Sequence, residues 1–211
     1  MLSRWAKDMF TRSAYDSNDR VNHATHHRRP SDAQFTARGE RPVFSAPSDA
    51  LITIVGQSPS LEAQTRGRCW DDRSGETLRS WLDVDESTFY DSGKFALVPM
   101  DFYYLGDAPG GKGAEAPRSW VAPTYHPQIM ALLPHVRLTI LVGSYAVRYY
   151  LNEDSKARLE DTVKDFADCL PAYFPIVHSS GRTDIWRTEH PWFDETVIPA
   201  LREQVHALLG A

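Results

Sequence analysis

Four short polar segments hold the side chains that could do chemistry, and each directly follows a short apolar run. They lie at 56–60, 99–106, 143–145 and 178–183. Short apolar runs rich in β-branched and aromatic residues, bounded by Gly or Pro, are typical of buried strands in a parallel sheet. Ligands of such sheets bind beyond the carboxyl ends of the strands, so the sequence predicts one site where these four segments meet.

His178 is the residue of these segments best suited to electrostatic or acid–base chemistry. At a strand end, an imidazole can face negative charge as that charge develops on a reacting group. Ser179, Ser180, Arg182 and Thr183 follow it, and hydroxyl and guanidinium groups can contact a phosphate backbone. A single histidine at a strand end is more often structural, so this interpretation depends on the other segments.

The segment 56–60 has the sequence Gly-Gln-Ser-Pro-Ser, which favours a tight turn. Gly56 permits the turn, and successive backbone N–H groups in such a turn can hold an anion or a water molecule. Gln57 and Ser58 add side-chain donors and acceptors. An ordinary strand-to-helix turn has the same pattern, and this segment alone favours that alternative.

Aromatic residues stand near two of the polar segments. Trp70 precedes a predicted helix and is either a core residue or a surface on which a planar base stacks. Met100, Asp101 and Phe102 follow the second strand and form either a packed turn or a pocket wall. Lys112 lies in a Gly-rich loop that lacks the strand–loop–helix context of a phosphate-binding P-loop.

The elements that must position these segments alternate along the chain. Strands are predicted at 51–55, 95–98, 138–142 and 174–177. Helices are predicted at 74–82, 127–133, 144–151, 155–169 and 193–209. Strands that alternate with helices predict an α/β fold, in which helices cover both faces of a parallel sheet. The second of these helices is expected to carry Pro127 in its first turn.

Length and composition indicate one globular domain with an N-terminal extension. The chain has 211 residues, a formal net charge of −5 and 42% hydrophobic residues. Residues 1–48 are polar and weakly periodic, which predicts an arm, partly helical or flexible, ahead of an α/β domain over 49–211. The basic stretch 23–29 is either a solvated tail, the stronger interpretation, or a contact to phosphates.

Several classes of protein are excluded by composition. No apolar run approaches the roughly 20 residues that span a bilayer, so we expect a soluble protein without membrane contact. The amino terminus lacks the apolar stretch of a secretory signal. Two cysteines cannot form a four-cysteine metal site, and we expect reduced thiols and no metal. We expect a monomer in the cytoplasm of a bacterium, associated with the nucleoid, or in the nucleus or an organelle of a eukaryote.

In their order along the chain, these segments resemble the motifs of the uracil-DNA glycosylase superfamily, in a compact bacterial-type branch without an iron–sulfur cluster. The segment 56–60 is similar to the first motif, and 67–82 to the segment that bears the base-stacking aromatic residue. Residues 95–106 are similar to an aromatic run of the branch. Residues 178–182, with 186–193, resemble the closing motif.

The resemblance implies a three-layer α/β/α sandwich around a four-stranded parallel sheet. It also implies an enzyme without metal or cofactor that flips a deaminated base, uracil by default, out of single- or double-stranded DNA and hydrolyses its N-glycosidic bond. By the same comparison, Trp70 would stack on the base, His178 would stabilise charge on its O2 atom, and the first-motif loop would hold the water. The implied catalytic residues are His178, Gln57 and Ser58. The implied base-binding residues are Gly56, Trp70, Met100, Asp101 and Phe102. The implied DNA-binding residues are Ser60, Lys112, Ser179, Ser180, Arg182 and Thr183.

The chain departs from the family pattern at several of these positions. Ser60 and Asp101 replace glycines, Ser179 and Gly181 replace prolines, and Thr183 replaces an asparagine. Loss of one positioned group can lower a rate by roughly 100-fold. The alternative hypothesis is therefore a catalytically weak or inactive protein that binds DNA or a lesion on the same scaffold. A small-molecule hydrolase or phosphate binder is less favoured, because the sequence has neither a Ser-His-Asp arrangement nor a phosphate loop.

Overall fold

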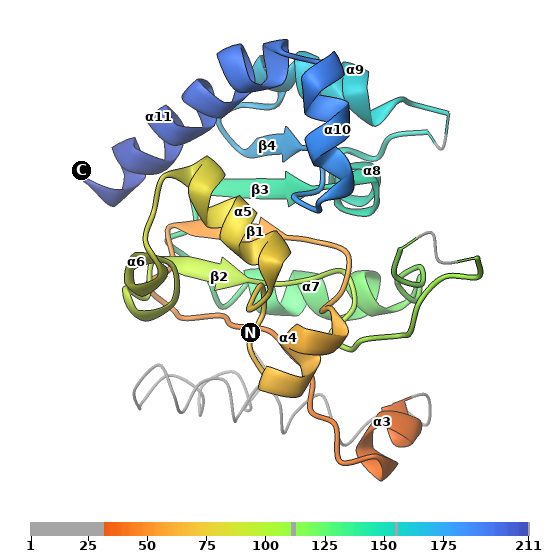
Figure 1. Cartoon of the computed structure of the whole chain (residues 1–211). Coiled ribbons are helices and arrows are strands. Elements are labelled where there is room, and N and C mark those ends of the chain that lie inside the picture. Colours follow the sequence, from red (N-terminus) through yellow and green to blue (C-terminus); the bar gives the residue numbers. More distant parts are fainter. Residues whose placement is uncertain (1–31, 111–112, 155, 211) are drawn as a thin grey trace.

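Four short strands form the centre of the structure, a computed structural model that describes residues 32–110, 113–154 and 156–210 (Figure 1). The strands are β1 (Ile52–Val55), β2 (Phe95–Leu97), β3 (Leu138–Val142) and β4 (Tyr173–Ile176). They pair in parallel in the order β2-β1-β3-β4. The predicted four-stranded parallel sheet is confirmed, with strand ends displaced by one residue at β1, β2 and β4.

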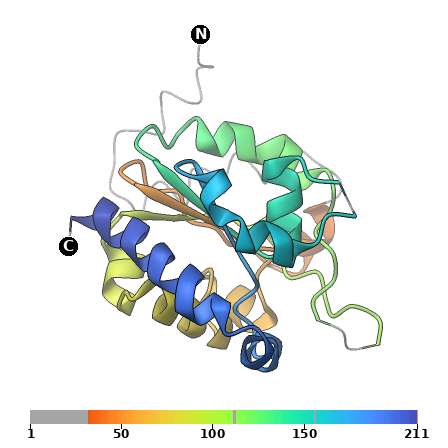
Figure 2. The same ribbon diagram turned by 90° about the horizontal axis from the view of Figure 1, so that it is seen from above.

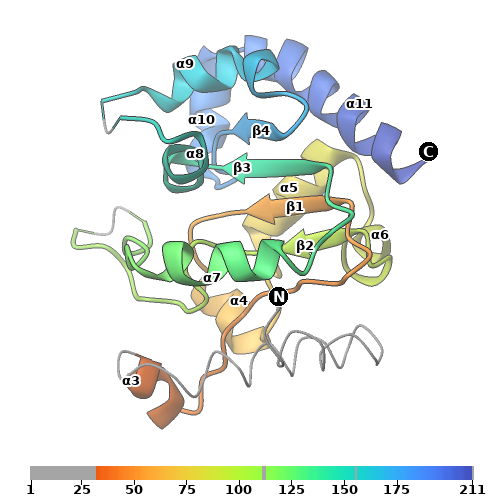
Figure 3. The same ribbon diagram turned by 180° about the vertical axis from the view of Figure 1, so that it is seen from behind.

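Helices cover both faces of this sheet, because successive side chains of a strand point to opposite sides and both sides are apolar. Ile54 and Ile140 face one layer, and Val55 and Leu141 face the other. The first layer consists of α5 (Arg73–Leu82), α6 (Glu86–Asp91) and α11 (Ile198–Leu209). The second layer consists of α7 (Val121–Met130) and α8 (Ser144–Leu151). Figures 2 and 3 show the two layers on either side of the sheet, which confirms the α/β/α sandwich.

The remaining helical elements are short and lie around the edges of the sandwich. They are α3 (Ala33–Ala37), α4 (Leu61–Arg66), α9 (Leu159–Lys164), a 3₁₀ turn (Phe166–Cys169), α10 (Arg182–Glu189) and a π-helical turn (Phe193–Val197). None of the helices in the described ranges is both long and apolar enough to cross a membrane.

Two helix predictions were wrong in detail. The helix predicted at 155–169 is divided, because Asp165 leaves the helical conformation between α9 and the 3₁₀ turn. Pro127 lies inside α7, which begins at Val121 rather than at the proline. An internal proline removes one backbone hydrogen bond, and the burial of Val121 and Ile129 in the core holds the helix across that position.

The segment 32–48, which its composition assigns to the arm, packs on the domain. Phe35, Val43 and Phe44 are almost completely buried, and the Phe35 ring stacks on Tyr103 with centroids 4.2 Å apart. The partners of these side chains are distant in sequence, so the local pattern could not reveal this part of the core. The basic stretch 23–29 lies outside the described residues.

A buried ion network fastens this segment to the domain. The Arg118 guanidinium donates to both oxygens of Asp101, from Nε at 2.7 Å and from Nη2 at 2.8 Å. Its Nη1 donates to Asp32 Oδ1 at 2.7 Å. Asp101 is completely buried. A buried carboxylate requires such a partner, because an isolated charge loses its hydration without compensation.

Candidate functional site

The loops that follow the four strands surround a cavity of about 800 Å³ at the carboxyl edge of the sheet. Each strand contributes to the wall through the loop behind it: 56–60 after β1, Pro99 after β2, 143–145 after β3, and His178 with 180–182 after β4. The structure thus brings together the four segments singled out in the sequence, as expected where parallel strands end at one edge of a sheet.

Trp70 and His178 lie side by side in this cavity. Their ring centroids are 5.9 Å apart and their planes are tilted by 40°. The Trp70 ring lies directly against Gly56, where a Cβ atom would be only 2.6 Å from Cζ2 of the indole. Glycine at this position therefore leaves room for an aromatic wall beside the histidine.

The backbone of Trp70 adopts an unusual conformation, with φ at 60°. A bulky residue in the left-handed region is strained and persists only where its surroundings fix it. Gly75, in the first turn of α5, fixes it by close contact: a Cβ on Gly75 would lie 1.7 Å from the Trp70 carbonyl oxygen. The start of α5 and the aromatic wall are therefore mutually dependent.

The substitution Gly75→Ala is expected to lower the free energy of unfolding by about 1–3 kcal/mol, because the added methyl group forces the main chain of Trp70 to move. Without this contact, alanine would stabilise a helix interior by roughly 0.5–1 kcal/mol relative to glycine. Urea unfolding of the wild type and of Gly75→Ala measures the sign of the change in the free energy of unfolding. Gly181→Ala is the control, because its Cβ would meet only Asp184 Oδ2, at 3.9 Å. If Gly75→Ala were more stable than the wild type, the close contact between Gly75 and the Trp70 main chain would be contradicted.

His178 is held in its neutral form by its surroundings. Burial lowers the pKa of His178, and the negative charge of Asp72 partly opposes that shift. The side chain is still partly exposed to the cavity, and its ring nitrogens make no hydrogen bond within the described part of the chain. A neutral imidazole carries one N–H donor, so His178 can direct this donor at a ligand in the cavity.

The hydroxyl groups around His178 satisfy main-chain carbonyls. Thr183 Oγ1 donates to the His178 carbonyl, and Ser179 Oγ donates to the Ser74 carbonyl at 2.9 Å. Ser179 is 0% exposed and Thr183 is 8% exposed. Both side chains therefore point inward and stabilise the turn behind β4, and a contact of either residue with DNA stays a prediction.

Ser180 and Arg182 differ from these buried neighbours in that both line the cavity. Arg182 is exposed at its mouth, next to Gly113 of the loop that spans 106–115. These are the positions of the closing segment from which a phosphate backbone can be reached. Lys112, also expected at DNA, lies outside the described residues.

The first loop contains two side chains with contrasting roles. The Gln57 amide donates to the carbonyls of Ala114 (3.1 Å) and Glu115 (2.8 Å), so it fastens the 106–115 loop beside the cavity. Ser58 Oγ is buried and has no hydrogen-bond partner among the described residues. An unpaired buried hydroxyl costs about 1–3 kcal/mol. The Ser58 hydroxyl is therefore the group of this wall best placed to bind a water or a substrate.

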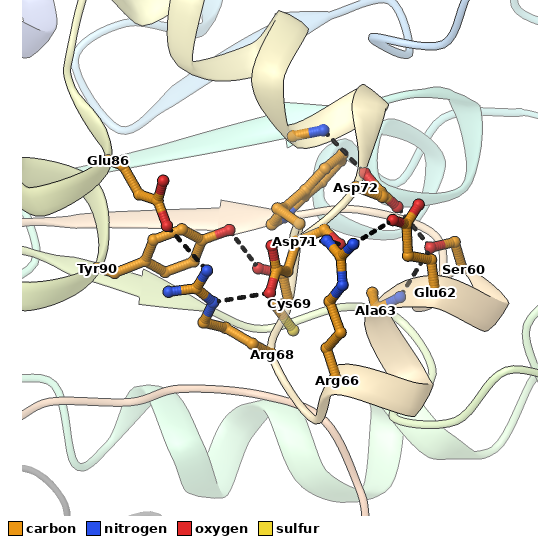
Figure 4. Close-up of polar contacts among 12 residues, drawn as sticks. Ser60, Glu62, Ala63, Arg66, Arg68, Cys69, Asp71, Asp72, Glu86 and Tyr90 are labelled. Atoms are coloured by element: carbon orange, nitrogen blue, oxygen red, sulfur yellow. Dashed lines mark hydrogen bonds and ion pairs between the residues drawn. The ribbon is translucent and has the colours of Figure 1, made fainter.

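Ser60 and Asp72 join the first loop to the start of α5 (Figure 4). Ser60 Oγ accepts from the Ala63 amide at 3.1 Å, which caps α4, and donates to Asp72 Oδ2 at 2.5 Å. Asp72 Oδ1 in turn accepts from the Gly75 amide at 2.9 Å, which caps α5. Asp72 lines the cavity and was missed in the sequence, where an aspartate just before a predicted helix was the available signal.

Three residues expected to bind the base lie outside the cavity. Met100 and Phe102 are buried in the clusters beneath α7 and α8, and Asp101 is held by Arg118. The backbone explains this placement: the amides of Met100 and Asp101 donate to the carbonyls of Gly56 and Gln57, so the chain runs beside the loop that follows β1 and directs these side chains into the second helical layer.

A buried histidine stands behind the cavity wall. His126 contacts the carbonyl of Pro99 through Nε2 at 3.0 Å and the hydroxyl of Tyr150 through Nδ1 at 2.8 Å. Because a carbonyl only accepts, Nε2 carries the proton and Tyr150 donates to Nδ1. Burial lowers the pKa of His126 to about 4. His126 was missed in the sequence, which offers no local signal for its contact with Pro99.

The pKa of His126 predicts a loss of stability in acid. The unfolded chain binds a proton near pH 6.5 and the folded protein only near pH 4, so the stabilisation is complete above pH 6.5 and is lost as the pH falls. His126 alone should lower the free energy of unfolding by about 3 kcal/mol between pH 6.5 and pH 4. Urea unfolding across this pH range measures how steeply the free energy of unfolding falls with pH. A His126→Gln protein with an unchanged slope would contradict the assignment, and His206→Gln, at a more exposed histidine, is the control.

The fold and the cavity define a class of α/β protein that binds its ligand beyond the carboxyl edge of a parallel sheet. Within this class, the family model of the uracil DNA glycosylase superfamily matches residues 42–202. The chain therefore belongs to the uracil DNA glycosylase superfamily, which confirms the resemblance noted in the sequence. The matched range contains all four described strands and every described segment around the cavity. Membership supports a glycosylase-type hydrolase that binds DNA.

Proposed function

We propose that the protein is a DNA glycosylase that flips a deaminated base out of DNA and hydrolyses its N-glycosidic bond in base excision repair, with uracil as the first expected substrate. The observation that carries the proposal is the pairing of Trp70 and His178, with ring centroids 5.9 Å apart, in one cavity at the strand ends. An aromatic surface beside a neutral hydrogen-bond donor suits a planar base that becomes negatively charged as it leaves.

The residues that line the cavity have separate roles in this proposal. The base stacks on Trp70, which contributes about 1–3 kcal/mol of binding. The N–H of His178 faces a carbonyl oxygen of the base and stabilises the charge that arrives there. The unpaired hydroxyl of Ser58 holds the attacking water. Ser180 and Arg182 lie at the mouth, where the phosphates on either side of the flipped nucleotide would pass.

A panel of oligonucleotides tests the proposal. Single-stranded and duplex DNA containing one uracil, hypoxanthine or xanthine is incubated with the protein, and abasic sites are cleaved by alkali and counted on a gel. We expect release of uracil and no cleavage of the undamaged sequence. Binding to a lesion without release of any base would instead favour the alternative, a lesion-binding protein on the same scaffold.

A further inference from the structure

The proposed reaction separates charge, and the site so far accounts for only one of the two charges. His178 faces the electrons that leave with the base, whereas the sugar left behind becomes electron-deficient. A nearby carboxylate is the group that would stabilise it. Among the described residues, the acids that line the cavity are Asp72 and Asp107. Asp107 is exposed on the 106–115 loop, where it accepts from the Tyr104 hydroxyl at 3.0 Å.

Asp72 is the acid that lies near His178. It lines the same cavity as His178, and its negative charge partly opposes the effect of burial on the pKa of that histidine. The loop that carries Ser58 contributes no acid of its own. Asp72 therefore supplies negative charge in a wall shared with both Ser58 and His178.

Asp72 differs from the neighbouring aspartate in its ion pairs. Asp71 accepts from Arg66 at 3.2 Å and from Arg68 at 3.0 Å, and these arginines lower the pKa of Asp71 (Figure 4). Asp72, by contrast, has no ion pair with any residue that the structure describes, and its hydrogen bonds come from the neutral Gly75 amide and Ser60 hydroxyl. These two donors orient the carboxylate and bring no net positive charge to it.

We propose that the Asp72 carboxylate stabilises the positive charge that develops on the deoxyribose as the base leaves. This inference rests on the proposed glycosylase function. The C1′–N bond breaks and both of its electrons depart on the base, toward His178. The cationic sugar faces Asp72 until the oxygen of a water molecule bonds to C1′. One proton of that water passes to the departed base, so the products are the hydroxylated abasic sugar and the neutral base, with no further reactant.

The substitution Asp72→Asn removes the charge and keeps a helix cap, because asparagine caps about as well as aspartate. We expect release of uracil in a single turnover to fall by about 100-fold, with unfolding in urea unchanged. Asp85→Asn is the matched control: Asp85 caps α6 through the Thr88 amide at 2.6 Å and does not line the cavity. It should release uracil at the wild-type rate.

A binding measurement separates the charge from the cap. The probes are two oligonucleotides, one with a cationic pyrrolidine in place of the sugar and one with a neutral tetrahydrofuran. The wild type should prefer the cationic probe by about tenfold, and Asp72→Asn should lose that preference. A slow variant that keeps the preference, or one that releases uracil at the wild-type rate, would overturn the role of Asp72 and leave the proposed function intact. A wild-type protein that releases no base from any substrate would overturn both.

Discussion

Replacement of His178 by alanine is expected to slow the release of uracil from DNA by about 10²–10³-fold, the effect of removing one positioned donor from a transition state. The burial that lowers the pKa of His178 leaves a neutral ring with one N–H to donate. This donor strengthens its hydrogen bond as charge moves onto the base, so its loss affects the chemical step more than binding. Because the ring makes no hydrogen bond within the described structure, stability should change little.

Single-turnover release from a uracil-containing oligonucleotide measures this effect, and urea unfolding checks the fold. His178→Gln retains a neutral donor and should recover part of the lost rate, which distinguishes a hydrogen-bond donor from a required cation. His206→Ala is the control, because His206 contacts the carbonyl of Asp83 and neither residue lines the cavity. If His178→Ala released uracil as fast as the wild type, His178 would not be a catalytic residue.

Replacement of Arg118 by alanine is expected to lower the free energy of unfolding by about 3–5 kcal/mol, the usual cost of leaving a buried charge without its partner. Asp101 is completely buried and receives two hydrogen bonds from this one guanidinium. The same side chain holds Asp32 and lies over the Phe35 ring, 5.0 Å from its centroid. Its loss therefore releases the 32–48 segment as well.

A second change distinguishes this charge effect from lost packing. Adding Asp101→Asn to Arg118→Ala removes the uncompensated carboxylate and should restore part of the lost stability in urea unfolding. Arg68→Ala is the matched control, since Arg68 pairs with Asp71 and Glu86 at the exposed surface. Such pairs contribute about 0–1 kcal/mol. Equal losses for the two arginines would contradict the special role of the buried network.

The sheet and the place of the site were predictable because both follow from local patterns and one geometric rule. Short apolar runs defined the strands, and parallel strands bring the segments behind them to one edge. The direction of individual side chains was not predictable. Asp101 follows a strand beside an apparent pocket motif, but the backbone hydrogen bonds of residues 100 and 101 to the loop after β1 direct its side chain toward Arg118, a partner distant in sequence.

The departures from the family pattern have a similar explanation. In the sequence, Ser60, Ser179 and Thr183 stand where a glycine, a proline and an asparagine are usual. In the structure, each hydroxyl donates a hydrogen bond, to Asp72, to the Ser74 carbonyl and to the His178 carbonyl respectively. Side-chain bonds of this kind can fix a turn that a proline would otherwise stiffen. The sequence shows that the usual residue is absent, but it does not reveal the side-chain hydrogen bond that takes its place.

The position of Asp32 and Phe35 has a consequence for where this domain begins. The superfamily match starts at residue 42, yet both side chains lie before it and complete the surroundings of Arg118. The unit that must fold together is therefore larger than the unit shared with the superfamily. A protein shortened to the matched range would keep every described residue of the cavity but would expose one face of Tyr103 and deprive Arg118 of the Asp32 carboxylate.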